Sequence, residues 1–367
     1  MQEHEPRFLV YSCYEGHVCG GWGNRMYGMV SGMLMALLTD RVFLVNVTQP
    51  TNLFHHFDSP CVSLDYQRHN LTVTRSMDMT DVSKQLPLFP YIDLEELFHE
   101  ERGIQFHGNN EFVKVLVENK RYRQRLLDMG FPAVSGTDRV DPSTVFACLL
   151  HFLIQPSRPL MVQLQPYLAQ YAASITVGVQ IRTGTDVPWK GDKNKMDPAN
   201  IPVFIECAQR LGKAIQKDPR LEYPLPRLIS LVTPSLFSPS AGIASEPRPV
   251  RIFLTTDSTR VQGELELQHG ALLVSTPGNV THTDKTKGDE AIKGLEKTML
   301  DWLLLGACQA VVMSESTFSR SAVMRSLAPK YVIIPRAPTS ADAICNLMRT
   351  HVYWGGVDQD LPLQPSA

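Results

Sequence analysis

The 367-residue chain has no excess of basic residues and no long hydrophobic run. Its 35 Lys and Arg are balanced by 37 Asp and Glu, so the formal net charge is -2 and nothing indicates a nucleic-acid partner. The longest apolar run, at 26–38, is too short to cross a bilayer, and the segment 1–8 lacks the basic start and apolar core of a signal peptide. We therefore expect no nucleic-acid partner and no membrane contact by this chain, which leaves small ligands and neutral polymers.

Common nucleotide and metal motifs are also missing. No GxxxxGK[ST] occurs, which excludes a P-loop, and the glycine-rich stretch CGGWGNRMYG at 19–28 does not match GxGxxG. The strand expected at 42–47 has Asn46 near its end, where a dinucleotide site has Asp or Glu, so an NAD-linked oxidoreductase is disfavoured. The one DxD, at 358–360, lies in a Pro-rich tail that we interpret as solvated. We predict no metal site.

The seven cysteines fit neither a zinc-finger spacing nor CxxC. Cys13 and Cys19 bracket a loop and are able to pair in an oxidising compartment, although free thiols remain the alternative. Cys148 and Cys308 lie in apolar helical contexts, where we expect them to pack as small hydrophobic residues. The sequons at 46–48, 70–72 and 279–281 are compatible with a secretory-pathway protein that has lost a leader or anchor, and a cytoplasmic location is the alternative.

The first half of the chain opens with a strand, a helix and a second strand. FLVYSC at 8–13 predicts a strand, the glycine-rich turn follows, and 24–38 predicts a buried helix before the strand at 42–47. The middle, 60–150, is weakly periodic and contains a charged helix candidate at 111–128. The start is therefore a βαβ unit.

From Ile175 onward strands and helices alternate regularly. This alternation predicts a parallel, doubly wound α/β sheet with helices on both faces. The Pro- and Ser-rich stretch 221–250 interrupts it and is predicted to be a surface insertion. We expect an N-terminal domain at 1–170, a C-terminal domain at 171–345 that carries the insertion, and a tail at 346–367.

Residues with useful chemistry follow the expected strands of the second half. These strands end at Arg182, at Asp257, at Ser275 and Thr276, and at Ser314, Glu315 and Ser316. Because ligands of open parallel sheets lie outside the carboxyl ends of the strands, these residues are expected at one shared edge. A guanidinium, hydroxyls and the N-H groups of a helix start suit a diphosphate. The alternatives are a structural ion pair for Arg182 and plain helix caps for Asp257, Ser316 or Thr317.

Four blocks carry a resemblance to a known family. GGWGNRMYGMVSGMLMALLTDRVFLV, QIRTGTD, FLTTDS and DWLLLGACQAVVMSESTFSRSAV, in this order and spacing, resemble the GT-B fucosyltransferases. The nearest likeness is the plant xyloglucan α-1,2-fucosyltransferase family, with more distant similarity to the nodulation, core α-1,6- and protein O-fucosyltransferases. The resemblance covers roughly 8–48 and 175–335.

The resemblance implies a fold, a reaction and a location. The expected fold is two Rossmann-like doubly wound domains facing a cleft, with the N-terminal domain on the acceptor side and GDP-fucose held mainly by the C-terminal domain. The expected reaction is an inverting, metal-independent transfer of fucose to a hydroxyl of an oligosaccharide or glycoconjugate in α linkage, of the α-1,2 type. GDP-fucose is then the donor substrate, no cofactor is needed, and the expected location is the Golgi lumen.

The family's motifs assign roles to residues of this chain. Arg182 matches the phosphate-binding arginine, Asp257 the aspartate near the nucleotide, and Ser316, Thr317 and Phe318 the motif that meets the diphosphate. Gly21, Gly23, Asn24 and Arg25 are interpreted as a close-approach loop that faces the donor.

Two features limit the assignment. Core-type enzymes have two adjacent arginines where this chain has Arg182 followed by Thr183, so that subfamily is disfavoured. The general base is not identified: Asp186, Asp192 and Glu315 are candidates, of which Asp186 and Glu315 join Arg182 in the predicted catalytic set. Another GDP-sugar as donor, and a noncatalytic glycan-binding member of the same fold, remain alternatives.

Overall fold

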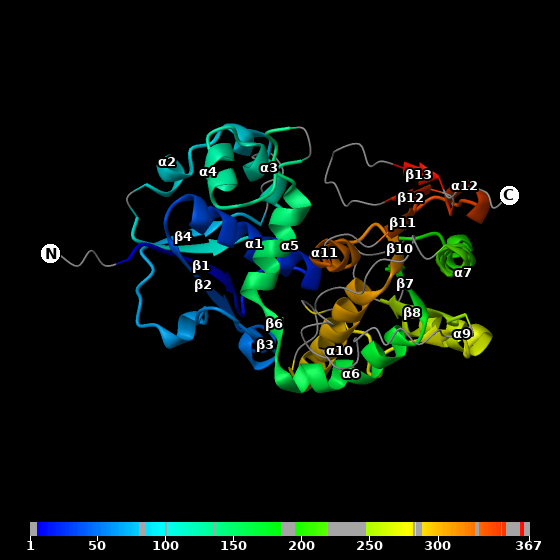
Figure 1. Ribbon diagram of the computed structural model, residues 1–367. Coiled ribbons are helices and arrows are strands. Elements are labelled where there is room, and N and C mark those ends of the chain that lie inside the picture. Colours follow the sequence, from blue (N-terminus) through cyan, green and yellow to red (C-terminus); the bar gives the residue numbers. More distant parts are fainter. Residues whose placement is uncertain are drawn as a thin grey trace. The chain divides into compact units, whose positions relative to one another are not determined.

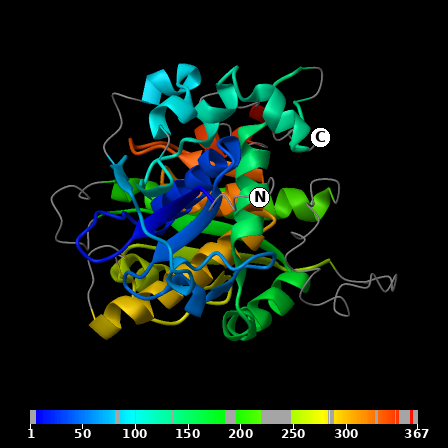
Figure 2. The same cartoon turned by 90° about the vertical axis from the view of Figure 1, so that its left-hand side faces the viewer.

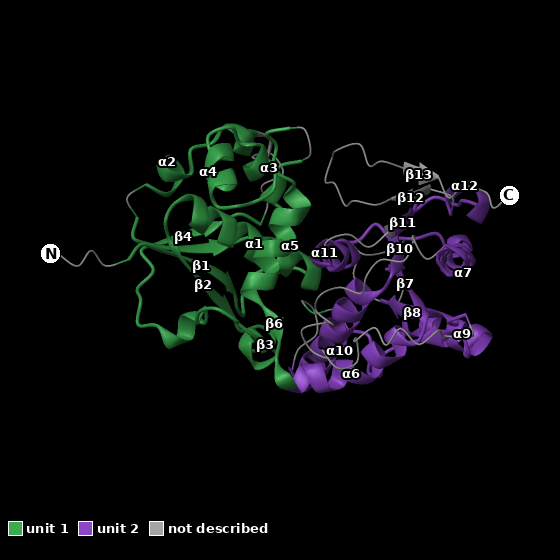
Figure 3. Cartoon of the chain, in the orientation of Figure 1, with its two compact units in different colours: residues 1–158, 283–285 green, residues 159–282, 286–367 purple. Residues whose placement is uncertain are grey.

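The structure is a computed structural model that describes residues 6–80, 86–99, 101–134, 137–184, 195–218, 247–281, 283, 288–326, 330–345, 347–349 and 360–362. The chain divides into two compact units (Figure 3). Unit 1 comprises Met1–Arg158 with Thr283–Lys285, and unit 2 comprises Pro159–His282 with Thr286–Ala367. Most of the predicted insertion at 221–250 lies outside the described residues.

Unit 1 is built on a parallel sheet. The strand β1 (Phe8–Cys13), the helix α1 (Trp22–Leu38) and the strand β2 (Val42–Val47) form the βαβ unit that the sequence predicts, drawn in blue in Figures 1 and 2. The strands β4 (Arg75–Asp78) and β5 (Gly103–His107) complete a sheet of order β2-β1-β5-β4, in which every pair is parallel.

Glycines bring α1 close to this sheet. A Cβ on Gly28 would lie 1.9 Å from the carbonyl oxygen of Gly108, and one on Gly32 would lie 3.1 Å from the Phe43 ring. The helix is buried over nearly its whole length, which explains its lack of charged residues beyond Arg25. The opposite face of the sheet carries Phe8, Val10 and Leu44, packed against Tyr66, Leu71 and Val73.

The rest of unit 1 consists of short elements. They are η1 (Leu53–His55), β3 (Phe57–Asp58), η2 (Tyr66–Arg68), η3 (Leu86–Tyr91), α2 (Leu94–Phe98), α3 (Val113–Glu118), α4 (Arg123–Asp128), α5 (Pro142–Leu153) and β6 (Gln155–Pro156). The prediction of one charged helix at 111–128 is wrong, because Asn119 adopts an extended conformation between α3 and α4. Its side-chain amide donates to the carbonyls of Phe89 and Ile92, which holds the break in place.

Unit 2 contains a larger sheet of order β13-β12-β11-β10-β7-β8-β9. Its strands are β7 (Ile175–Ile181), β8 (Val250–Thr256), β9 (Leu273–Val274), β10 (Ala310–Ser314), β11 (Lys330–Ile334), β12 (Leu347–Arg349) and β13 (Asp360–Pro362). The strands from β11 to β9 are parallel, as predicted, whereas β12 and β13 pair antiparallel at one edge. Part of the predicted tail therefore extends this sheet.

Helices cover both faces of the larger sheet (Figure 1). They are α6 (Arg158–Ala172), η4 (Pro198–Asn200), α7 (Ile201–Lys217), α9 (Thr259–His269), α10 (Gly288–Ala307), α11 (Thr317–Arg325) and α12 (Ala341–Ile344). The helices α7 and α9 pack through Phe204, Leu211 and Leu265 into one core with the strands. The helix α10 lies on the other face, where Leu305 and Cys308 leave no space for a side chain at position 178 of β7.

Two disulfides are present. Cys13 pairs with Cys19, and Cys207 of α7 pairs with Cys345, 138 residues away. Cys308 is buried, as predicted, but Cys148 is exposed because it lies on the outer side of α5. The two disulfides are consistent with an oxidising compartment such as the secretory pathway. Within the described residues, no helix combines the length and apolar composition needed to cross a membrane.

Candidate functional site

The order of strands in unit 2 creates a switch point beside β7. From β7 the chain proceeds to β8 and β9 on one side, and then returns to place β10 on the other side of β7. The helices that follow β7 and β10 consequently leave the sheet on opposite faces, and in open α/β sheets ligands bind outside the carboxyl ends of the strands at such a point. Arg182 directly follows β7, and α11 begins at Thr317, shortly after β10 ends at Ser314, so both lie at this edge of the sheet.

Asp257 holds Arg182 and the loop after β7 in place. Its carboxylate accepts hydrogen bonds from the backbone N-H groups of Thr183 (2.7 Å) and Gly184 (2.9 Å), and from the Thr183 hydroxyl (3.1 Å). It also pairs with the Arg182 guanidinium, whose Nη1 lies 3.2 Å from Oδ2. Gly184 has a φ of +67°, which favours glycine at this close turn. The ion pair that was the alternative role of Arg182 is thus present.

Arg182 is nevertheless not shut off from the surface. Its side chain retains 22% exposure, against 13% for Asp257. Its backbone N-H donates to the Ser314 hydroxyl of β10 at 2.9 Å, which ties the ends of β7 and β10 together. A guanidinium has five donors in a planar fork, so it is able to serve more than one partner.

The start of α11 lies at the same edge. Ser316 is the N-cap residue, and its hydroxyl accepts from the backbone N-H of Phe318 at 3.3 Å. The first N-H groups of a helix carry partial positive charge and suit an anion. Glu315 is half exposed and pairs with Arg320 at 3.2 Å, so its carboxylate faces solvent.

Two strand-end hydroxyls that the sequence placed at this edge are already bonded within the protein. Ser275 donates to Glu266 at 2.6 Å, and Thr276 is buried against Asp301 and Lys297. Burial raises the pKa of Asp301, and the ammonium of Lys297, 3.3 Å away, opposes that shift. The buried pair of Lys297 and Asp301 fixes the segment that follows β9. In the sequence, the pair is indicated only by its spacing of four residues on α10.

The glycine-rich turn belongs to unit 1. Gly20 has a φ of +72°, Gly21 is the N-cap residue of α1, and Gly23 is buried in the first turn. Arg25 is 1% exposed, and its guanidinium donates to the carbonyls of Gly20 (3.1 Å) and Gln49. Arg25 therefore shapes the turn from inside.

The predicted site residues thus fall into three groups. Arg182, Asp257, Glu315, Ser316, Thr317 and Phe318 lie at one edge of the sheet of unit 2, while Gly21, Gly23, Asn24 and Arg25 surround the start of α1 in unit 1. Asp186 and Asp192 lie outside the described residues. The contacts of all these residues with a donor stay predictions. Thr183 and Gly184 are contacts of Asp257 that the sequence did not suggest.

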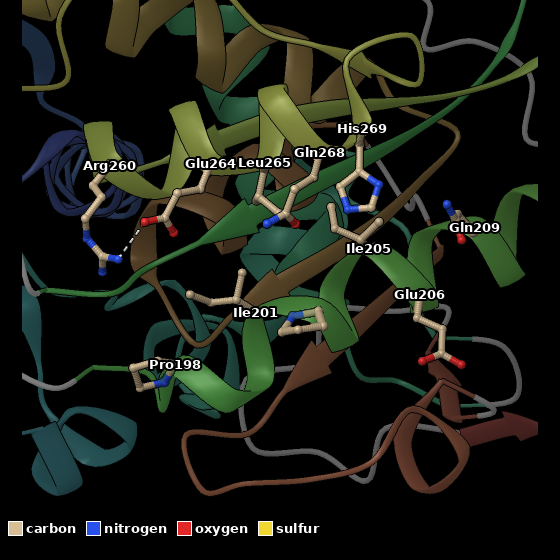
Figure 4. Close-up of a pocket in the computed structure, with 11 residues that line it drawn as sticks. Pro198, Ile201, Ile205, Glu206, Gln209, Arg260, Glu264, Leu265, Gln268 and His269 are labelled. Carbon is tan, nitrogen blue, oxygen red and sulfur yellow. Dashed lines mark hydrogen bonds and ion pairs between the residues drawn. The ribbon is translucent and has the colours of Figure 1, made fainter.

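A cavity of about 380 Å³ lies elsewhere on unit 2, between α7 and α9 (Figure 4). Ile201, Ile205 and Leu265 form its apolar part, and Arg260 pairs with Glu264 at its rim. None of the predicted site residues lines it, so we do not place the donor there. In the part of the chain that the structure describes, no group of three or more His, Cys, Asp or Glu side chains is arranged to hold a metal ion.

These features define an α/β protein with two parallel sheets and an edge suited to an anionic ligand at the switch point of the second. Residues 2–68 match the family model described as xyloglucan fucosyltransferase. No curated protein sequence matches the chain.

Solved structures extend the likeness to the fold. An arginine-to-lysine mutant of Arabidopsis thaliana FUT1 in complex with GDP is similar at 16% identity and a TM-score of 0.55, with 92% of this chain and 72% of that chain covered. Fucosyltransferase NodZ from Bradyrhizobium follows at 15% identity and a TM-score of 0.49, with 90% of this chain and 96% of that chain covered. The resemblance to fucosyltransferases and the α/β fold class are thereby confirmed, whereas the facing arrangement of the two domains stays a prediction.

Proposed function

We propose that this chain is a fucosyltransferase that moves L-fucose from GDP-β-L-fucose to a hydroxyl of a glycan acceptor, with inversion at the sugar carbon. The observation that carries the proposal is the meeting of Arg182 and the N-terminus of α11 at the switch point of unit 2. The match of residues 2–68 to a fucosyltransferase family model supports it from the other end of the chain.

Charge on the leaving group dominates the chemistry of this reaction. The acceptor oxygen attacks C1 of fucose, the bond from C1 to the β-phosphate oxygen breaks, and its electron pair stays on GDP. The proton of the acceptor hydroxyl passes to a general base, for which Asp186, Asp192 and Glu315 are the candidates. Preorganised donors aimed at the developing charge lower the barrier to that step. Arg182 and the N-H groups at the start of α11 supply such donors, so we propose that they act on the diphosphate without a metal ion.

Asp257 is a positioning residue in this scheme. It neutralises part of the charge of Arg182, fixes one arm of the guanidinium and fixes the two backbone N-H groups that follow. The arginine is therefore ordered before a donor arrives, which reduces the entropy lost on binding. A direct contact of Asp257 with the nucleotide, as the family motif implies, is part of the same proposal.

Unit 1 is proposed to bind the acceptor, and the linkage is proposed to be of the α-1,2 type. The Golgi lumen is the proposed location, and the two disulfides support an oxidising compartment. A different GDP-sugar as donor is the alternative, and a noncatalytic glycan-binding protein of the same fold is the second.

A donor and acceptor screen tests the proposal. Purified protein is incubated with GDP-fucose, GDP-mannose, UDP-galactose and a panel of neutral oligosaccharides, and released nucleotide and fucosylated product are measured. Among the three donors, we expect only GDP-fucose to release nucleotide, and only when an acceptor is present. Binding of GDP without turnover on any acceptor would favour the noncatalytic glycan-binding protein. Turnover only with another GDP-sugar would favour the alternative donor.

A further inference from the structure

A row of polar side chains crosses the carboxyl end of the sheet of unit 1. Asp78 of β4 is the register partner of His107 of β5, and Ser12 of β1 is the register partner of Asn46 of β2. Since Phe106 pairs with Tyr11, His107 stands next to Ser12. Residues that share a register position in a parallel sheet project to the same face. The row lies at the switch point of this sheet, because β2 is on one side of β1 and β5 on the other.

Three members of this row have buried polar atoms that nothing in the described structure satisfies. The Ser12 hydroxyl, the Asn46 amide oxygen and His107 Nε2 all lack a hydrogen-bond partner among the described residues. Ser12 is 4% exposed and His107 is 3% exposed. A buried polar group without a partner destabilises the fold, so three in one row need an explanation.

His107 is held in one orientation. Its Nδ1 lies 3.1 Å from the carbonyl oxygen of Ser12, and a carbonyl only accepts, so Nδ1 carries the proton and Nε2 presents a lone pair. Burial lowers the pKa of His107, and the nearby His17 lowers it further, while Asp78 and the bond to Ser12 oppose the shift. The ring is therefore a neutral hydrogen-bond acceptor at neutral pH.

A surface loop covers this ring. His17 stacks on His107 with ring centroids 4.0 Å apart, and Tyr14 contacts both rings edge-on. Both residues lie in the loop closed by the disulfide between Cys13 and Cys19, whose residue Val18 is 68% exposed. Access to Nε2 thus requires the movement of a short exposed loop and no change in the sheet.

We propose that this polar row is a binding site for a sugar hydroxyl of the acceptor glycan, and that His107 Nε2 accepts the hydrogen bond that the hydroxyl donates. The proposal rests on the function proposed above. The hydrogen-bonding character of these atoms favours a hydroxyl ligand. The unsatisfied atoms of His107 and Asn46 are acceptors, and the Ser12 hydroxyl both donates and accepts, as a sugar hydroxyl does. An anion is disfavoured, because the row contains the carboxylate of Asp78 and no cation.

Ser12→Ala gives the sharpest test, because the two interpretations predict opposite outcomes. If the hydroxyl is only a buried unsatisfied group, its removal leaves Tm unchanged or raises it and leaves kinetics unchanged. If it binds the acceptor, kcat/KM for the acceptor falls about tenfold while the KM for GDP-fucose and the Tm shift produced by GDP stay as in the wild type. Ser157→Ala is the matched control, because Ser157 also has a buried, unpartnered hydroxyl in unit 1 but lies outside the row.

A second measurement reports binding without turnover. The ¹⁵N resonance of His107 Nε2 is followed by NMR in the full chain during titration with xyloglucan oligosaccharides and galactose-terminated disaccharides, with His69→Gln and His107→Gln used for assignment. A saturable shift with a neutral glycan that needs higher glycan concentrations in Ser12→Ala than in the wild type supports the site even if no fucose is transferred. Unchanged acceptor kinetics in Ser12→Ala with an active wild type, or no shift with any glycan at millimolar concentration, overturns it.

Discussion

Replacement of Arg182 by lysine separates its proposed catalytic role from its structural one. The guanidinium places Nη1 3.2 Å from Asp257 and is a planar fork that can bind a phosphate with two parallel hydrogen bonds, whereas an ammonium is a point charge without that fork. The ion pair is partly exposed, and lysine can retain it, so the fold loses about 1 kcal/mol or less and Tm shifts by no more than about 2–4 °C. Loss of one preorganised donor to the departing phosphate lowers kcat/KM by about 10²–10³-fold.

The assay combines thermal unfolding with steady-state kinetics on purified protein. Arg260→Lys is the matched control, because Arg260 also pairs with a carboxylate of unit 2, Glu264 at 2.9 Å, but lies away from the switch point. We expect wild-type kinetics from the control. A kcat/KM for Arg182→Lys within a few-fold of the wild type would refute the phosphate role, and a collapse of Tm with proportionate loss of activity would assign Arg182 to structure alone.

Three other outcomes are expected. GDP raises Tm without added metal, and EDTA changes neither this shift nor turnover; loss of both in EDTA contradicts a metal-independent site. Because the pKa of His107 is lower in the folded than in the unfolded state, the unfolded state binds more protons in acid, so the free energy of unfolding falls as pH drops from 7 to 5. This fall is smaller in His107→Gln. Free energies of unfolding from urea titrations that depend equally on pH in both proteins contradict this. Cys207→Ser with Cys345→Ser removes a crosslink of 138 residues and costs up to about 5 kcal/mol, whereas a Tm equal to that of the wild type would show that the disulfide adds nothing.

Local pattern was sufficient to predict which residues stand at the carboxyl edge of the sheet of unit 2. Each strand of a parallel sheet is a short buried run followed by a polar turn, so the positions of Arg182, Asp257 and Ser316 at strand ends could be inferred from the sequence. The burial of helix α1 was also predictable from local pattern, since its residues are apolar over nearly its whole length. The break between α3 and α4 was not, because the partners of Asn119 are carbonyls about 30 residues away.

The sequence alone determined the fold class, the strand ends and the resemblance to fucosyltransferases, because each of these depends on residues close together in the chain. Only the tertiary structure decided which strand ends are neighbours. Ser314 bonds to Arg182 across 132 residues, His107 meets Ser12 across 95, and Cys207 finds Cys345 across 138. Such pairs follow from the order of strands in each sheet and the packing of helices on its faces, and periodicity contains no information about either.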